Sequence, residues 1–161
     1  SLAALSPAYD GIGLSRNEPV LVASYPAGFL DSESLRKNLW PVSSFTEIKE
    51  LYSFASSTPG TVDVFSLHGV IGAQEGSSGG SVARATDGKL LGLVVTRSLG
   101  DTTGDRDLFS LGIPYINEDF SLDIKKTLEE FLASDIDAYQ AWFSENVRPQ
   151  LKERLLKEIE K

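Results

Sequence analysis

The chain has 161 residues, of which 41% are hydrophobic, with a formal net charge of −8 and no cysteine. This length suits one domain, or one domain with an appendage, and no apolar run is long enough to span a bilayer. The negative charge argues against nucleic acid or an anionic membrane as partner, since both need clustered Lys and Arg, and the lack of cysteine excludes disulfides, thiolate metal sites and cysteine nucleophiles.

Residues 1–17 carry Pro7, Gly11 and Gly13 among short apolar stretches, and we expect an extended connector there. The chain begins without Met and shows no signal peptide. We therefore interpret it as a fragment, a processed product or a trimmed form of a longer protein. The compartment stays open; an exported or periplasmic bacterial protein is favoured, since such proteins often lack cysteine.

Several short apolar segments follow, separated by turn signals. Residues 18–25 predict a strand that ends at Pro26. Residues 31–56 are ambiguous, because Ser44 and Glu47 form a capping box typical of a helix, whereas the aromatic and β-branched residues favour strands. We favour strands. Further strands are predicted at 61–70, 82–85, 89–97 and 107–113, and this spacing indicates an antiparallel barrel or sandwich.

From Ser121 onward the apolar residues recur at helical spacing. Pro149 is expected to end or kink the second of two helices. We therefore expect a connector at 1–17, a β-barrel at 18–120 and a helical extension at 121–161. The extension either packs on the barrel or binds a partner. Its predicted apolar face consists of Ile124, Leu128, Phe131 and Leu132, followed by Ile136, Tyr139, Phe143, Val147, Leu151 and Leu155.

The stretch Glu75-Gly76-Ser77-Ser78-Gly79-Gly80 lies between two apolar segments, 62–71 and 90–95. A serine between glycines suits a tight turn that exposes its hydroxyl to a substrate carbonyl. Two N–H groups of such a turn can point at one oxygen, as a developing oxyanion requires. A flexible linker would have no reason to be followed by two strands, and a phosphate-binding loop would carry a Lys-Ser or Lys-Thr pair and open a helix.

Together with Tyr25-Pro26-Ala27-Gly28 upstream and Leu108-Phe109-Ser110-Leu111-Gly112-Ile113-Pro114 downstream, this order resembles the second barrel of the trypsin/chymotrypsin-like serine peptidases. The resemblance covers about residues 18–133. It implies a mainly β fold: an antiparallel barrel like the C-terminal half of the chymotrypsin-like double barrel, followed by C-terminal α-helices.

The resemblance also implies roles for individual residues. Ser78 would be the nucleophile, and the backbone N–H groups of Gly76 and Ser78 would form the oxyanion hole. The catalytic His and Asp would come from an N-terminal barrel segment that is missing here. The chain's one histidine, His68, does not match that base, and a structural strand histidine is the favoured interpretation. Ser77 stands where the family usually has Asp or Asn. No metal or cofactor is expected.

The same resemblance places the base of the substrate pocket at Gly72 and Ala73, neither of which carries a charge, and the wall at residues 95–97. There Arg97 would either narrow the pocket or favour an acidic or polar group; alternatively, it is a surface residue.

The favoured function is the C-terminal half of a trypsin-like serine endopeptidase that hydrolyses peptide or protein substrates through an acyl-enzyme on Ser78. The chain alone would be incomplete and nearly inactive. The alternatives are a catalytically inactive, peptidase-like binding module and a complete small hydrolase that uses His68.

Overall fold

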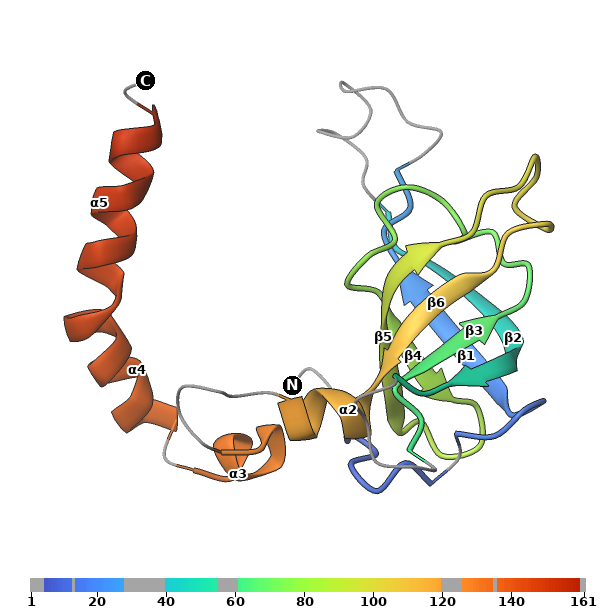
Figure 1. Ribbon diagram of the computed structural model, residues 1–161, viewed down its shortest axis with the longest axis horizontal. Coiled ribbons are helices and arrows are strands. Elements are labelled where there is room, and N and C mark those ends of the chain that lie inside the picture. Colours follow the sequence, from blue (N-terminus) through green and yellow to red (C-terminus); the bar gives the residue numbers. More distant parts are fainter. Residues whose placement is uncertain are drawn as a thin grey trace. The chain divides into compact units, whose positions relative to one another are not determined.

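The six strands of the structure form one closed barrel (Figure 1). Every neighbouring pair is antiparallel, and the order β1-β2-β3-β6-β5-β4 closes because β4 also pairs with β1. The prediction of a mainly β fold built on an antiparallel barrel is therefore confirmed. The strands are β1 Pro19–Ser24, β2 Val42–Tyr52, β3 Val64–Leu67, β4 Ser81–Arg84, β5 Leu90–Arg97 and β6 Leu108–Gly112.

This is a computed structural model, and it describes residues 5–12, 14–27, 40–54, 61–119, 126–134 and 136–159. The chain divides into two compact units, Ser1–Asp119 and Phe120–Lys161. The predictions for Ile124 and for residues 31–39 lie outside the described residues. No helix in the described ranges is long and apolar enough to cross a membrane.

Strand β2 settles the ambiguous segment in favour of a strand. It pairs with β1 on one side, from Ser24↔Val42 to Pro19↔Glu47, and with β3 on the other. The helix suggested by the capping box does not form at 42–52, because partners on both sides satisfy the backbone of this segment as a strand. Local propensity gives way here to tertiary pairing.

Alternating side chains of the strands fill the barrel. Val20 and Val22 of β1 are buried while their neighbours are more exposed, the period of two that a strand with one face inward requires. Phe65 of β3 is fully buried. Strand β5 passes Phe65 at Gly92, where an added Cβ would lie 2.5 Å from the Leu111 carbonyl oxygen and 2.7 Å from the Phe65 ring. The rest of the buried hydrophobic core consists of Ala8, Ile48, Leu67, Val70, Ala73, Val82, Leu91, Val94 and Leu108.

Boundaries differ from the prediction at both ends of β3 and after β6, and β3 begins at Val64 rather than at residue 61. Strand β3 ends at Leu67, short of the predicted Val70, because its partner β6 begins at the residue paired with Leu67. After Gly112 the chain enters helix α2, Ile113–Asp119, which the sequence pattern did not predict. Pro114 lies in its first turn, where a residue without an N–H is tolerated.

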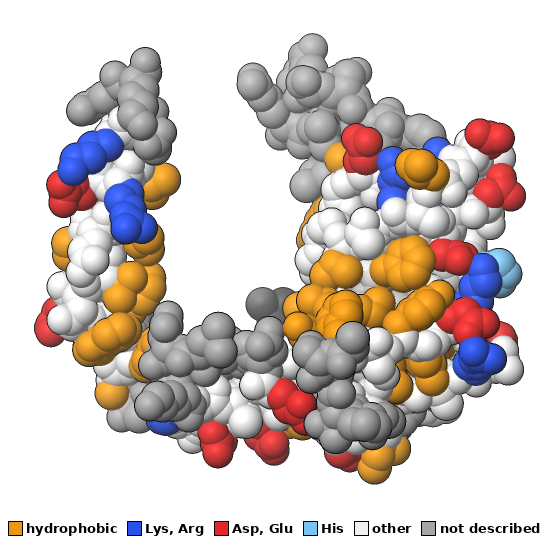
Figure 2. Space-filling view, viewed as in Figure 1, with side chains coloured by type: hydrophobic (Ala, Val, Ile, Leu, Met, Phe, Trp, Pro, Cys, Tyr) orange, Lys and Arg blue, Asp and Glu red, His pale blue; other side chains and the backbone are white. Residues whose placement is uncertain are grey.

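Aromatic side chains cover part of the outer surface of the barrel. Figure 2 shows hydrophobic side chains gathered on the face that carries β3 and β6. Tyr52 of β2 packs against Phe109 of β6 with ring centroids 6.1 Å apart, and Phe54 packs edge-on against Tyr115 of α2 at 5.2 Å. These pairs connect the end of β2 to β6 and to α2.

The second unit contains α3 Leu128–Leu132, α4 Ile136–Asn146 and α5 Arg148–Ile159. Thr127 caps α3 in a capping box with Glu130. Tyr139 of α4 packs against Phe131 of α3 at 4.8 Å between ring centroids. A break lies between α4 and α5 at Val147, close to the predicted one; Pro149 is the second residue of α5, where a missing backbone N–H is tolerated.

The close approach at Gly92 generates a test of the barrel. We expect Gly92→Ala to lower the free energy of unfolding by about 1–3 kcal/mol or more, because the new methyl group meets a backbone carbonyl and a buried ring. Gly104→Ala is the matched control, since its Cβ would meet only Thr102 Oγ1, at 3.6 Å. Native-state hydrogen exchange of β3 and β6 amides measures the difference; equal protection in both variants contradicts the packing described.

Candidate functional site

The glycine–serine loop between β3 and β4 lies directly against the end of β1. The Ala27 N–H donates to the Glu75 carbonyl at 2.7 Å. A Cβ on Gly76 would lie 2.8 Å from the Ala27 Cβ and 2.9 Å from the Tyr25 carbonyl oxygen. A Cβ on Gly80 would lie 2.7 Å from the Ser24 Cβ. The glycines therefore allow a contact between two backbone segments that no other residue permits.

Ser77 holds the loop from the inside. Its side chain is buried, and its hydroxyl donates to the Gly72 carbonyl oxygen. The Ser24 hydroxyl in turn donates to Ser77 Oγ at 3.5 Å. Ser77 is thus a small, buried group that fixes the loop to the end of the barrel. Its polar atom is satisfied by neighbours within the barrel end.

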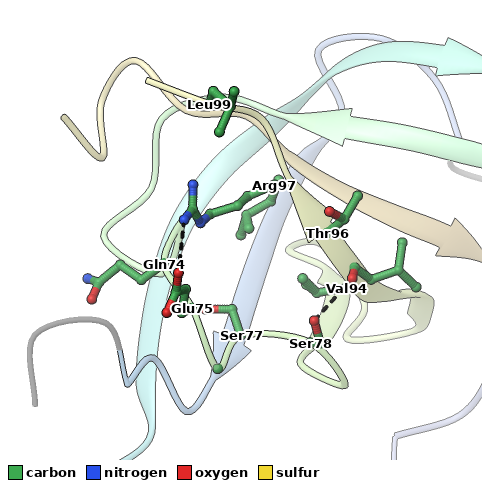
Figure 3. A pocket seen from close by; sticks show the side chains of 11 residues that line it. Gln74, Glu75, Ser77, Ser78, Val94, Thr96, Arg97 and Leu99 are labelled. Carbon is green, nitrogen blue, oxygen red and sulfur yellow. Dashed lines mark hydrogen bonds and ion pairs between the residues drawn. The ribbon is translucent and has the colours of Figure 1, made fainter. Parts of the chain in front are cut away.

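Ser78 points the opposite way, into solvent at the edge of β5 (Figure 3). Its hydroxyl donates to the Val95 carbonyl oxygen at 3.0 Å. That carbonyl belongs to a β-bulge, because Val94 pairs with Ser110 and Thr96 with Phe109, which leaves Val95 without a partner in β6. Bulges commonly lie beside active sites, where they redirect a strand edge.

The backbone around Ser78 leaves two donors available. Among the described residues, no protein acceptor binds the N–H of Gly76 or of Ser78. The next two N–H groups have acceptors. The Gly79 N–H donates to the Val94 carbonyl at 2.8 Å, and the Gly80 N–H donates to the Ser77 carbonyl at 3.0 Å. Gly76 has φ +87°, in the left-handed region that favours glycine. Two unpaired N–H groups beside an exposed hydroxyl are what an oxyanion site requires.

A pocket of about 380 Å³ opens beside Ser78, between the loop and β5. Of the predicted site residues, Gly76, Ser78 and Arg97 line it. Gly72 and Ala73 are buried beneath the loop and are not among the lining residues, so their role in binding substrate stays a prediction. Val95 and Thr96 of the predicted pocket wall line it as well, and the remaining lining residues are Gln74, Glu75, Ser77, Val94, Leu99 and Leu108.

Sequence reasoning missed six of the lining residues, and three of them, Gln74, Glu75 and Leu99, show why. Gln74 lies at the position that follows the predicted base, and its side-chain amide folds back onto the Ile71 carbonyl at 2.6 Å. Glu75 pairs with Arg97 across the pocket, with 3.5 Å between Oε1 and Nη2 (Figure 3). Leu99 comes from the loop after β5 and is 91% exposed. The motif spacing pointed near Gln74 and Glu75, whereas no local pattern indicates Leu99.

His68 lies in a different place. It lines a separate pocket with Thr46 and Lys49, and its Nδ1 lies 3.4 Å from Asp107 Oδ1. Asp107 also accepts a hydrogen bond from Lys49 Nζ at 2.8 Å. No hydrogen bond or ion pair joins His68 to Ser78 in the described part of the chain. The structure therefore gives Ser78 no histidine from this chain.

The described ranges contain no group of three or more His, Asp or Glu side chains placed to hold a metal ion.

Compared with known proteins, the chain matches no family model and no curated sequence. The functional argument therefore depends on the geometry of the loop, the pocket and β5.

The two left-handed glycines of the loop provide a matched pair of variants. Gly76→Ala and Gly79→Ala impose similar backbone strain, since φ is +87° and +84°, but only Gly76 also faces atoms within 3 Å. We expect Gly76→Ala to be the more destabilising by about 1–3 kcal/mol, because of that steric overlap. Urea unfolding of the two variants measures the difference. An equal loss would mean that the contact with β1 does not constrain the loop.

The Lys49–Asp107 pair generates a titration test. The hydrogen bond from Lys49 to Asp107 raises the pKa of the lysine above its usual value of 10.5, against a smaller opposing effect of burial. A raised pKa stabilises the fold fully below the unfolded value, and that contribution is lost as pH rises through the folded pKa. In an NMR titration, Asp107→Asn should return the Lys49 pKa toward 10.5. Glu50→Gln, which removes only a weaker charge effect, should leave most of the shift.

Proposed function

We propose that this chain is the second barrel of a trypsin/chymotrypsin-like serine endopeptidase, in which Ser78 attacks the carbonyl of a peptide bond. One observation carries the proposal: an exposed serine hydroxyl lies on a glycine turn, beside unpaired backbone N–H groups and at the mouth of a pocket. Peptide or protein substrates are the partners that such a site would take.

The proposed reaction assigns a task to each group. Ser78 Oγ forms a bond to the carbonyl carbon, and its proton passes to a general base. The carbonyl oxygen becomes an oxyanion, which the N–H groups of Gly76 and Ser78 would stabilise. Loss of one such donor typically costs about 10²–10³ in rate. The base then protonates the leaving amine, and water completes the cycle by hydrolysing the acyl-enzyme.

The base is the part that this chain does not supply. Its one histidine is paired with Asp107, and the Ser78 hydroxyl donates to a backbone carbonyl. A carbonyl oxygen accepts a hydrogen bond but does not take up a proton at neutral pH. We therefore propose that the histidine and aspartate come from an N-terminal barrel segment, which would place the imidazole on the exposed side of Ser78.

A second candidate is a peptidase-like module that binds peptides without cleaving them. The hydrogen bond from Ser78 to Val95 favours it, since that bond holds the hydroxyl in an arrangement that needs no base. The pocket and the loop would then serve recognition alone.

A fluorophosphonate probe, which labels serines activated by a neighbouring base, separates these functions. In the natural full-length gene product we expect labelling on Ser78, several orders of magnitude faster than in the isolated 161-residue chain. Ser78→Ala should abolish it. Ser43→Ala, which removes an exposed serine of β2, should not.

Two outcomes would overturn the proposal. A folded full-length product in which Ser78 stays unlabelled would identify the inactive binding module. Rapid labelling of the isolated chain that His68→Ala abolishes would identify a self-sufficient hydrolase, with His68 reaching Ser78 by a movement that the structure does not show.

A further inference from the structure

The pocket beside Ser78 combines an apolar floor with one cation. Val94 and Leu108, each about 1% exposed, form part of its lining. Arg97, at the end of β5, is the only Lys or Arg among the lining residues and is 25% exposed. Figure 3 shows Val94 and Arg97 among the side chains around this pocket. That combination suits a short aliphatic stem with a negatively charged end.

The guanidinium of Arg97 has unused binding capacity. It carries five N–H donors in a planar fork. Nη2 lies 3.5 Å from Glu75 Oε1, and Nη1 donates to the Ser98 carbonyl at 3.3 Å. Charge-assisted hydrogen bonds between guanidinium and carboxylate are usually 2.7–2.9 Å long and often bidentate. The contact with Glu75 is therefore loose, and a better-placed carboxylate would gain closer bonds.

The Glu75 side chain can move away from Arg97. Its side chain is 81% exposed, and exposed ion pairs contribute little, a median of about 0–1 kcal/mol. Rotation of the Glu75 side chain out into solvent would release the Arg97 guanidinium at a small cost in free energy. The backbone of Glu75 need not move, because its carbonyl remains bonded to the Ala27 N–H.

A second arginine adds positive charge behind the same loop. Arg106 Nε donates to the Gly100 carbonyl at 2.8 Å, and Nη1 donates to the Ala73 carbonyl at 3.5 Å. Within the described residues, no carboxylate pairs with Arg106. Arg106 thus contacts the backbone at Ala73 and Arg97 contacts the side chain of Glu75, so two guanidiniums lie near residues 73–75 of this acidic chain.

We propose that the pocket beside Ser78 recognises a peptide carboxylate, which Arg97 binds as Glu75 swings out to solvent. The carboxylate is that of an Asp or Glu side chain or of the peptide's C-terminus. The conclusion that a bound acidic residue marks the cleavage site rests on the proposed peptidase function, but the binding step needs no activated serine. A Lys or Arg side chain would place a second cation next to Arg97, which opposes its entry.

Binding to the isolated 161-residue chain tests this directly. NMR titrations would compare N-acetyl-Ala-Ala-Glu-amide with its neutral isostere N-acetyl-Ala-Ala-Gln-amide. A third peptide, N-acetyl-Ala-Ala-Ala with a free C-terminus, carries the carboxylate at its end. We expect one of the two carboxylate peptides to bind at least about tenfold more tightly than the Gln peptide. The tighter of the two then identifies the source of the carboxylate.

Variants tie that preference to the pocket. Arg97→Gln should remove the preference, Arg97→Lys should keep part of it as a point charge, and Glu75→Gln should strengthen binding by removing the internal competitor. Arg16→Gln, which breaks the surface pair with Glu50, is the control and should change nothing. Because these titrations use the isolated chain and need no activated serine, a failed labelling experiment and a failed binding experiment remain distinct. Equal binding of the Glu, Gln and free-acid peptides, or a preference that survives Arg97→Gln, overturns the inference.

Discussion

The contact between the glycine–serine loop and the end of β1 is the constraint on which the site depends. Gly76 and Gly80 each approach β1 or the segment after it so closely that a methyl group would overlap their neighbours. Ser77 closes the same contact from within, through the Gly72 carbonyl. Because the Ser77 side chain is held inside the end of the barrel, the side chain of the next residue, Ser78, points outward. Ser78 is therefore exposed because of the packing of the backbone around it, and its own hydrogen bond only selects a rotamer.

The bulge in β5 supplies the other half of the site. In a regular strand, successive side chains alternate between the two faces. Here Val94 is buried while both Val95 and Thr96 are exposed, a phase shift that one unpaired residue produces. The shift directs the Val95 carbonyl at Ser78 and turns Arg97 toward the pocket. A strand without the bulge would place these groups on different faces, so the irregularity brings the Ser78 hydroxyl and the pocket together.

Local sequence patterns predicted much of this fold. Alternation and turn residues located β1, β5 and β6 within a few residues, because these strands bury one face and end at turns. Helix α2 escaped prediction since Ile113 continues the apolar run of β6. The motif spacing located part of the pocket, since Gly76, Ser78 and residues 95–97 line it, whereas a binding role for the buried Gly72 and Ala73 stays a prediction. The pairing of Glu75 with Arg97 depends on the closure of the barrel, which no local spacing reveals.

The present arrangement of Ser78 is compatible with later activation because little free energy holds it. A net contribution of about 0.5–1.5 kcal/mol is usual for one intramolecular hydrogen bond, and the Ser78–Val95 bond is open to water. In the proposed mechanism, an imidazole on the exposed side would offer the same proton a stronger acceptor, which rotation about one side-chain bond would reach. The unpaired N–H groups of Gly76 and Ser78 belong to the backbone and would need no such change. This barrel would then stabilise the developing charge, and a general base from another segment would activate Ser78.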